Sequence, residues 1–286
     1  TPQETSDLFA TLRTLQRRGT TILLITHKLK EVIALCDAVT VMRQGAVVLD
    51  TATAATSLDA LAEAMVGRRV QLGRVERKPA TAGPVLLQAT GLRWRDAYGV
   101  ARLDGVSLRL RAGEIVGVAG VAGNGQSELL DVLSGLLRPH EGTIELGGAR
   151  FDPRRALTPA NARALGLAHV PEDRQRRGLV LQFPAWESAV LGHQAQPRYA
   201  RGAFLNRAAM RADTARMMQR YDVRPPDADL RSGKLSGGNQ QKLVLAREAM
   251  PGPQVLLVGQ PTRGVDIGAV EFIHARLRAM RDAGGA

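Results

Sequence analysis

The stretch Leu235-Ser236-Gly237-Gly238-Asn239-Gln240-Gln241-Lys242 is the most informative segment of this sequence. Two adjacent glycines follow a serine, and they leave backbone N–H groups bare where a helix is expected to begin. That helix is predicted over residues 240–250, with Leu243, Leu245 and Ala246 on its buried side. Bare amides, a serine hydroxyl and the positive end of a helix dipole form a site suited to a polyphosphate.

The same stretch resembles the signature motif of ABC-type ATPases, in the Asn-Gln-Gln form typical of bacterial importers for simple sugars and nucleosides. The resemblance implies an α/β fold, an ABC-type P-loop ATPase domain with a mixed sheet core and a helical signature subdomain. It also implies that Ser236, Gly237, Gly238, Asn239 and Gln240 bind the phosphates of ATP. The alternative interpretation is a helix with a serine N-cap and a flexible entry.

A short apolar run over residues 254–258 is predicted to be a buried strand. It continues into Gly259-Gln260-Pro261-Thr262-Arg263-Gly264-Val265-Asp266, followed by a helical pattern, and this order resembles the Walker B strand and D-loop of ABC ATPases. In that family the strand usually ends in Asp-Glu, whereas this sequence has Gly259 and Gln260. A glycine offers no oxygen to a metal ion, and an amide does not accept a proton as a carboxylate does. The sequence therefore keeps the strand but lacks the side chains that would bind the metal ion and accept the proton.

A second glycine-rich segment, Gly120-Val121-Ala122-Gly123-Asn124-Gly125-Gln126-Ser127, follows a strand predicted over residues 114–119 and opens a helix predicted to reach Leu136. It resembles the phosphate-binding loop of P-loop ATPases, which implies that its eight residues bind nucleotide and that Ser127 reaches Mg²⁺. Gln126 stands where the family has a lysine. A neutral hydrogen bond is worth about 0.5–1.5 kcal/mol against about 1.5–3 for a charged one. We therefore expect this loop to bind ATP and to hydrolyse it poorly. For the loop alone, a dinucleotide-binding turn is the alternative.

Two smaller elements complete the nucleotide site by resemblance. Ala168-His169-Val170-Pro171-Glu172-Asp173-Arg174 stands where ABC ATPases have their Q-loop, which implies that Glu172 is a catalytic residue that contacts the metal ion or the attacking water. The alternative is an ordinary strand exit at a proline. Tyr98 lies where an aromatic residue of the family stacks on adenine. Trp94 is a rival for that role, and for either ring the alternative is that it covers a sheet edge.

The N-terminal part begins with an amphipathic pattern and continues into a strand, a histidine and a hairpin. Leucines spaced at helical intervals predict a helix that ends near Gly19. Residues 20–26 are predicted to be an apolar strand followed by His27, and residues 39–42 and 46–49 are predicted to pair as a hairpin. This order resembles the end of an ABC ATPase domain, which implies that His27 is the catalytic switch histidine at the γ-phosphate. A polar residue at a strand exit is the alternative.

The order of these motifs predicts a tandem arrangement in which the tail of one ATPase domain precedes the start of another. Residues 1–68 would be the C-terminal part of the first nucleotide-binding domain, and residues 69–84, rich in charge, Pro and Gly, would be the linker. Residues 85–286 would be the second nucleotide-binding domain, truncated before its own switch histidine. The chain therefore looks like an internal fragment of a fused tandem subunit.

The composition agrees with this prediction. A chain of 286 residues that is 44% hydrophobic can bury one full core and a partial one. The net charge is +12, but the basic residues are scattered and only 3% of the residues are aromatic, so nucleic acid is not an expected partner. A basic surface that faces anionic lipid headgroups is compatible with this charge.

ABC domains work as head-to-tail pairs, in which the signature of one domain acts on nucleotide held by the other. The resemblance therefore implies that Ser236–Gln240 and His27 act at the nucleotide of the first domain. The loop at Gly120–Ser127 would serve a second, degenerate site that mainly holds ATP.

Taken together, the resemblance implies the ATP-binding and ATP-hydrolysing subunit of a bacterial importer for nucleosides or simple sugars, with nucleosides favoured. ATP and Mg²⁺ are the implied cofactors, with Ser127 and Glu172 at the metal. The implied partners are transmembrane permease subunits that dock near residues Asp173 to Val190 and, indirectly, a solute-binding protein. The implied location is peripheral, on the cytoplasmic face of the inner membrane.

Two alternatives stay open. Phe183, Trp186 and Glu187 are either docking residues or core residues of the helical subdomain. The competing function is a soluble ABC ATPase that acts in DNA repair or translation without a membrane partner. A repair ATPase would need a coiled-coil insertion, and the sequence shows no sustained heptads.

Overall fold

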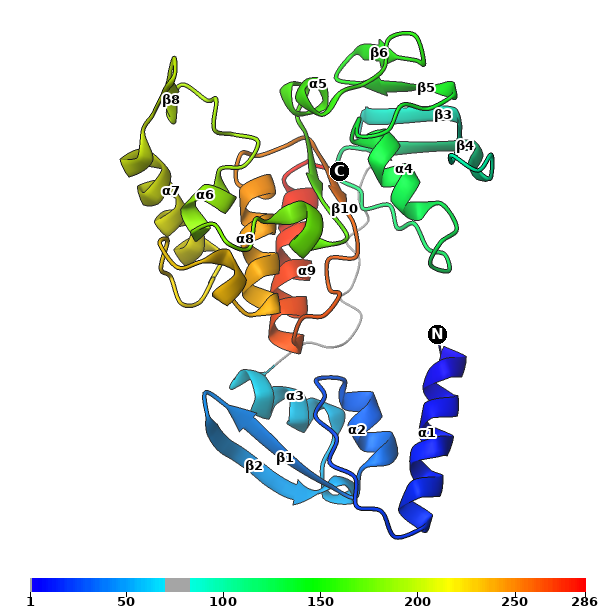
Figure 1. Ribbon diagram of the computed structural model, residues 1–286, viewed down its shortest axis with the longest axis vertical. Helices are drawn as coiled ribbons and strands as arrows, with labels where there is room; N and C mark the ends of the chain where they lie inside the picture. The colour runs from blue at the N-terminus through cyan, green and yellow to red at the C-terminus, as the bar shows by residue number, and fades with distance from the viewer. Residues whose placement is uncertain (1, 70–82) are drawn as a thin grey trace. The chain divides into compact units, whose positions relative to one another are not determined.

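The computed structural model describes residues 2–69 and 83–286 (Figure 1). It divides into two compact units, Thr1–Glu76 with Asp266–Glu271, and Arg77–Val265 with Phe272–Ala286. Most of the predicted linker at residues 69–84 lies outside the described residues. The predicted domain boundaries at 68 and 85 stay predictions.

The first unit contains the predicted N-terminal helix and hairpin. Its elements are α1 (Pro2–Arg17), α2 (Leu29–Leu35), β1 (Ala38–Arg43), β2 (Ala46–Ala52), η1 (Thr53–Ala55) and α3 (Leu58–Val66). Strands β1 and β2 are antiparallel, and their turn residues Gln44 and Gly45 have φ values of 52° and 82°. These positive angles are those of the tight turns that match the twist of a hairpin. Val41 and Leu61 are buried at the centre of a small apolar core.

The strand predicted over residues 20–26 is wrong. The segment has no strand hydrogen-bonding pattern, and its Leu23 and Ile25 side chains are 88% and 90% exposed. A strand exists only where a neighbour accepts and donates its backbone hydrogen bonds. In the described part of the first unit the only strand pair is β1 with β2. The segment therefore has strand composition without a strand partner.

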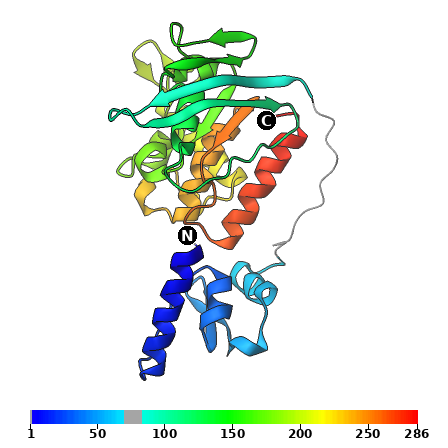
Figure 2. The ribbon, with the colours of Figure 1, turned by 90° about the vertical axis from the view of Figure 1, so that its right-hand side faces the viewer.

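The second unit contains an antiparallel sheet at one end. Its strand order is β4 (Ala101–Arg111), β3 (Val85–Arg95), β5 (Glu141–Leu146) and β6 (Ala149–Phe151). Leu87, Leu92 and Ile144 from this sheet are buried in one core with Val132 and Leu133 of α4 (Gln126–Leu133). Figures 1 and 2 show this sheet at one end of the unit and the helices α6 to α9 at the other.

A pair of parallel strands lies between these ends. β7 (Leu167–Val170), preceded by α5 (Pro159–Ala164), pairs with β10 (Val255–Val258) in a register that sets Val170 opposite Val258. The predicted strand over residues 254–258 is thus confirmed. The remaining elements are η2 (Arg174–Gly178), α6 (Ala185–Ala189), β8 (Ala200–Arg201), β9 (Phe204–Leu205), α7 (Arg207–Arg220), η3 (Ser232–Lys234), α8 (Gly237–Ala249) and α9 (Ile267–Asp282).

The strand predicted over residues 114–119 is also wrong. At one end Gly285 and Ala286 lie between this segment and β10, because Gly113 N donates to Gly285 O at 3.0 Å and Leu256 N donates to Ala286 O at 2.8 Å. Beyond them a cavity of about 820 Å³ separates residues 114–119 from β10. Strands pair at a spacing of about 4.8 Å, so a segment across a cavity forms no ladder.

Two helix boundaries differ from those predicted. The signature helix α8 begins at Gly237 rather than at residue 240, because Ser236 already serves as its N-cap. Helix α4 ends at Leu133 rather than at Leu136, because Gly135 follows with a φ of 78°, the left-handed conformation that ends many helices.

Candidate functional site

The loop at residues 120–127 is folded around its own polar groups. Gly125 is the N-cap of α4 with a φ of 95°, and a Cβ at this position would lie 2.1 Å from the Arg102 carbonyl oxygen. Only glycine fits both constraints. Gln126, at the position where a lysine was expected, donates through Nε2 to the Val121 carbonyl at 3.0 Å. This hydrogen bond between two residues of the loop therefore stabilises the loop's conformation.

A residue that sequence analysis missed connects this loop to the β3–β4 turn. Arg102 on β4 donates through Nη1 to Gly123 O at 3.3 Å and through Nε to Asp96 Oδ2 at 2.9 Å. The other oxygen of Asp96 accepts from the backbone N–H of Tyr98 at 2.9 Å. Desolvation raises the pKa of Asp96, but hydrogen bonds from Val100, Arg102 and Tyr98 together hold it below its ordinary value. Nothing in the local sequence around Arg102 signals its bond to Gly123, because the two residues are 21 positions apart.

The two aromatic candidates lie in different surroundings. Tyr98 is 91% exposed at the tip of the β3–β4 turn. The Trp94 ring stacks on His140 with a centroid separation of 6.3 Å and an interplanar angle of 2°. Tyr98 thus presents a free ring, whereas one face of Trp94 is occupied.

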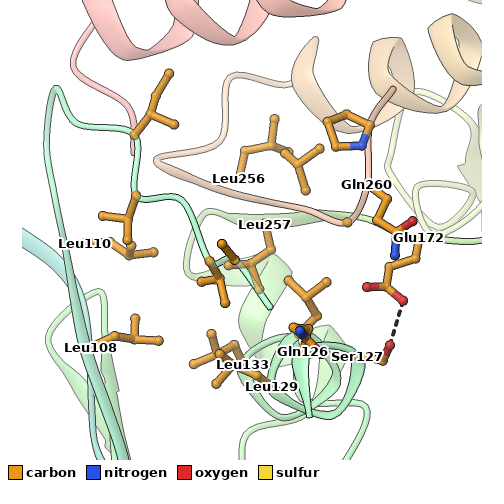
Figure 3. A pocket seen from close by; sticks show the side chains of 18 of the residues that line it. Leu108, Leu110, Gln126, Ser127, Leu129, Leu133, Glu172, Leu256, Leu257 and Gln260 are labelled. Carbon is orange, nitrogen blue, oxygen red and sulfur yellow. Dashed lines mark hydrogen bonds between the residues drawn. The ribbon is translucent and has the colours of Figure 1, made fainter. Parts of the chain in front are cut away.

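Glu172 meets the phosphate-binding loop at Ser127. The Ser127 hydroxyl donates to Glu172 Oε2 at 2.6 Å, as the dashed line in Figure 3 marks. Ser127 is in the first turn of α4, and Glu172 follows the end of β7 after Pro171. A carboxylate and a hydroxyl, both hard oxygen ligands, therefore lie together at the positive end of a helix.

Ser127 and Glu172 belong to the polar lining of the 820 Å³ cavity, together with Gln126, Gln260, Glu114, Arg263 and Arg281. Figure 3 shows Gln126, Ser127, Glu172 and Gln260 near one another, and leucines over the rest of the wall. The apolar part consists largely of Leu108, Leu110, Leu129, Leu133, Leu256 and Leu257. Ser236 to Gln240 do not line this cavity.

The signature segment has its own internal hydrogen bonds. Ser236 Oγ accepts from Asn239 N at 3.4 Å and from Asn239 Nδ2 at 2.9 Å. The buried Gln240 side chain donates to Ser232 O at 3.3 Å and to Leu235 O at 3.1 Å. Gly238 is buried as well. Ser236, Gly237 and Asn239 therefore form the accessible start of α8, while the side chain of Gln240 holds the loop in shape.

Buried charges that sequence analysis missed hold α8 in place. Arg247 donates through Nη1 to Gly178 O at 2.6 Å and to Ser188 O at 3.0 Å, and through Nε to Glu248 Oε1 at 2.7 Å. The side chains of Arg247 and Glu248 are 6% and 1% exposed. Buried polar groups of this kind are costly unless they are paired, so this network fixes the helix against η2 and α6.

The segment Asp173–Val190 contains both core and surface. Trp186 is 5% exposed and shares a small core with Val190 and Met210, so its place is in the core of the helical part. Phe183 is 40% exposed and is available at the surface. Trp186 is therefore a core residue, whereas Phe183 lies at the surface, where a docking partner can reach it.

The last predicted site residue, His27, is exposed in the first unit. Within residues 2–69 and 83–286, no group of three or more His, Cys, Asp or Glu side chains forms a ready metal site. Among the helices in the same ranges, none combines the length and hydropathy of a membrane span.

A family model described as ABC transporter matches residues 103–263. The guanosine import ATP-binding protein NupO of Bacillus subtilis (strain 168) is 41% identical over 286 residues, which is 100% of this chain and 55% of that protein. The nucleoside import ATP-binding protein NupA of Lactococcus lactis subsp. cremoris is 39% identical over 100% of this chain and 56% of that protein. The chain thus spans about half the length of the curated relatives it matches.

Solved structures agree on the fold. A nucleotide-free ATP-binding cassette from an ABC transporter superposes with a TM-score of 0.59 at 20% identity, and covers 71% of this chain and 79% of its own. The dimeric bacterial ABC transporter cassette MJ0796 gives a TM-score of 0.56 at 21% identity, over 69% and 83% of the two chains. The predicted α/β cassette fold is therefore confirmed.

Proposed function

Because this chain belongs to the ABC transporter family, we propose that it is part of the ATP-binding subunit of an importer and that its second unit holds ATP in the loop at residues 120–127. The observation that carries the proposal is the meeting of this loop with Glu172, through the 2.6 Å hydrogen bond from Ser127. The backbone amides at the start of α4 would bind the phosphates. The exposed ring of Tyr98 would stack on the adenine.

Ser127 and Glu172 would hold Mg²⁺ together with the nucleotide phosphates. The bound ion would neutralise phosphate charge. Two hard oxygen ligands suit Mg²⁺, which keeps several waters and binds through few protein ligands. This mode of binding agrees with the described residues, among which no three His, Cys, Asp or Glu side chains gather at one place.

We propose that this loop binds ATP and turns it over slowly. Gln126 supplies no positive charge, and its amide is already bonded to Val121. Gln260, at the position of the expected base, accepts no proton. Hydrolysis would occur at a second nucleotide, where Ser236, Gly237 and Asn239 of α8 and His27 of the first unit would act with a partner domain. A domain boundary between residues 68 and 85 is part of this proposal.

The partners we propose are permease subunits that dock on the segment Asp173–Val190, with Phe183 and Val180 as exposed apolar residues. The subunit would be peripheral on the cytoplasmic face of the membrane, and a solute-binding protein would act with it indirectly. The relatives NupO and NupA are named for guanosine and nucleoside import, which favours nucleosides over simple sugars as the solute. They also favour import over DNA repair or translation.

Two measurements test this proposal. Isothermal titration of the 286-residue chain with ATP should show one binding event, and Ser127→Ala should weaken it. Vesicles that contain permease subunits and the subunit with this chain should take up guanosine when supplied with ATP. Absence of ATP binding would contradict the nucleotide site. ATP-driven uptake of ribose without uptake of guanosine would contradict the nucleoside assignment alone.

A further inference from the structure

A short hairpin between α6 and α7 projects from the helical part of the second unit. Its strands β8 and β9 are antiparallel, with Arg201 directly opposite Phe204. Gly202 in the turn adopts a φ of 60°, as the tight turns of hairpins require. Asn206 N donates to Tyr199 O at 2.8 Å and extends the ladder by one step. Figure 1 shows β8 beyond α7, at the outer edge of the unit.

The base of this hairpin is fixed to the helical core. Tyr199 packs against the small core around Trp186. Arg198 donates through Nη2 to Oδ1 of Asp213 on α7 at 2.7 Å. Trp186 belongs to the segment Asp173–Val190, on which we propose that the permease docks. The hairpin therefore extends from the part of the chain that would face a membrane protein.

The tip of the hairpin exposes apolar side chains. Phe204 is 82% exposed and Leu205 is 52% exposed. Single exposed apolar residues are common on soluble proteins, whereas apolar residues that gather on one element and are rimmed by polar groups mark interaction sites. Residues directly opposite in an antiparallel pair share one face, so the Phe204 ring and the Arg201 side chain emerge on the same side. The tip thus presents an aromatic ring together with a positive charge.

The surroundings of the tip are positively charged. Between residues 188 and 212 the sequence has four arginines and no Asp or Glu. Two of them, Arg198 and Arg211, pair with aspartates. The other two, Arg201 and Arg207, are exposed, and among the described residues no carboxylate lies within ion-pair distance of either. Their charges are therefore available to an anionic partner.

We propose that the β8–β9 hairpin binds the surface of an anionic bilayer, with the Phe204 ring among the headgroups and Arg201 and Arg207 at the lipid phosphates. Phe and Leu beside Arg is the composition of segments that lie in the membrane interface. Each basic residue close to an anionic bilayer adds to the attraction. The inference rests on the proposed peripheral location and adds a direct lipid contact to it.

The shape of the tip favours lipid over a protein as its partner. Residues 201–208 are all exposed, so the tip is convex and offers no groove to a partner. A fluid headgroup layer adapts to a projecting ring, whereas a protein would need a pocket of matching shape. The anionic headgroups also surround the tip, so Arg201 and Arg207 meet phosphate without a fixed geometry.

A tryptophan at the tip reports the contact directly. The 286-residue chain with Phe204→Trp is mixed with vesicles of equal parts phosphatidylglycerol and phosphatidylcholine, without nucleotide or permease. The emission of the new tryptophan should shift to the blue, and brominated lipid should quench it. Val47→Trp, at a 59% exposed position of the β1–β2 hairpin, is the matched control and should show neither change. The inference is overturned if the chain does not bind these vesicles, or if it binds and the emission of Phe204→Trp stays unshifted.

Removal of the two unpaired charges tests the source of the attraction. Arg201→Gln with Arg207→Gln should weaken binding to these vesicles by about ten- to thirtyfold, measured by co-sedimentation. Arg109→Gln with Arg138→Gln removes the same charge from exposed positions elsewhere, and should weaken binding by less than about twofold because the attraction acts only over about 10 Å. Equal losses in the two double variants would assign binding to the net charge of the whole chain and overturn the inference.

Vesicles that contain permease subunits distinguish lipid from protein as the partner. If the emission of Phe204→Trp shifts only when the permease is present, the hairpin binds protein and the lipid contact is wrong. A shift of the same size with and without the permease supports the lipid contact.

Titration with ATP separates this inference from the proposed function. Phe204→Ser should bind ATP as wild type does, and should bind the anionic vesicles about tenfold more weakly. If wild type binds no ATP, the proposed nucleotide site fails and the hairpin contact is judged by the vesicles alone. If ATP binds and Phe204→Ser binds the vesicles as wild type does, only the hairpin contact fails.

Discussion

Helices α4 and α8 both begin with exposed backbone N–H groups, and they differ in what holds each helix in place. Helix α4 follows a glycine-rich loop and α8 begins with two glycines, and each presents backbone N–H groups, one after Gly125 and the other after Ser236. The loop before α4 is tied by Arg102 and Asp96, whose side chains are 36% and 16% exposed. Helix α8 is tied by Arg247 and Glu248, which are almost completely buried.

The difference between the two helices separates nucleotide binding, at α4, from the positioning of a helix, at α8. A phosphate cradle is a property of backbone and helix direction, so it survives at α4 although Gln126 replaces the expected lysine. The buried network of α8 adds no ligand contact, and it ties the last turn of that helix to η2 and α6. We therefore expect substitutions around α4 to change nucleotide affinity, and substitutions around α8 to change stability or coupling.

The largest effect is expected from the buried anchor of α8. Arg247→Met should lower the free energy of unfolding by about 3–5 kcal/mol, because it leaves Glu248 and two carbonyl groups without their main donor. Urea denaturation of the isolated chain measures this. Arg201→Met, at an exposed site, is the control and should change stability by less than about 0.5 kcal/mol. A loss below about 1 kcal/mol for Arg247→Met would mean that α8 is not anchored by this network.

The second effect concerns the complete subunit. Ser236→Arg should lower ATP-driven transport in vesicles about a hundredfold or more, since a bulky cation would replace the hydroxyl cap and block the bare amides. His27→Ala should be nearly as damaging, and Ser127→Ala should be milder because its site turns over little. Equal losses for Ser236→Arg and Ser127→Ala would mean that the loop at 120–127 carries hydrolysis, and the two helix starts would then be equivalent.

The third effect is on the loop before α4. Arg102→Ala should weaken ATP binding by about tenfold, because Gly123 and Asp96 both lose their shared donor. Calorimetric titration of the isolated chain gives the affinity. Arg109→Ala, also on β4, is a matched control that should bind ATP as wild type does. A normal affinity for Arg102→Ala would show that the loop holds its shape without this tie.

A smaller effect is expected where the loop departs from its family. Gln126→Lys adds a positive charge near the phosphates, and it should tighten ATP binding by about two- to tenfold. Hydrolysis should not appear, because no base is restored at Gln260. Phosphate release measured over hours tests this. Turnover of about 1 s⁻¹ in the variant would contradict the assigned role of Gln260.

The smallest effect is that of pH on the surroundings of α8. Burial, followed by the positive charge of Arg163, lowers the pKa of His193 below its ordinary value. As pH falls below about 6.5, the unfolded chain gains this proton before the folded chain does, so the folded state loses stability. Thermal melts from pH 7.5 to 5.5 should show a decline that His193→Gln reduces. An unchanged decline in that variant would assign it to other groups, among them His169 and His274, whose pKa values burial also lowers.

Local chemistry was readable from the sequence. Ser236 starts a helix because its hydroxyl accepts from the backbone N–H of Asn239 three residues on, and Gln44-Gly45 forms a hairpin turn because both residues adopt positive φ. The glycine-rich segment at residues 120–127 likewise predicted the helix that follows it, because Gly125 adopts a positive φ as the N-cap of that helix. Each of these contacts joins residues a few positions apart. The sequence also carried the family resemblance, which the comparisons confirm.

The tertiary structure alone decided the rest. Residues 20–26 and 114–119 have the composition of buried strands, yet neither forms one. A strand forms only where a second segment pairs with its backbone, and among the described residues no segment pairs with either of these two. The division of Trp186 into the core and Phe183 onto the surface, and the ties made by Arg102 and Arg247, likewise depend on which segments meet.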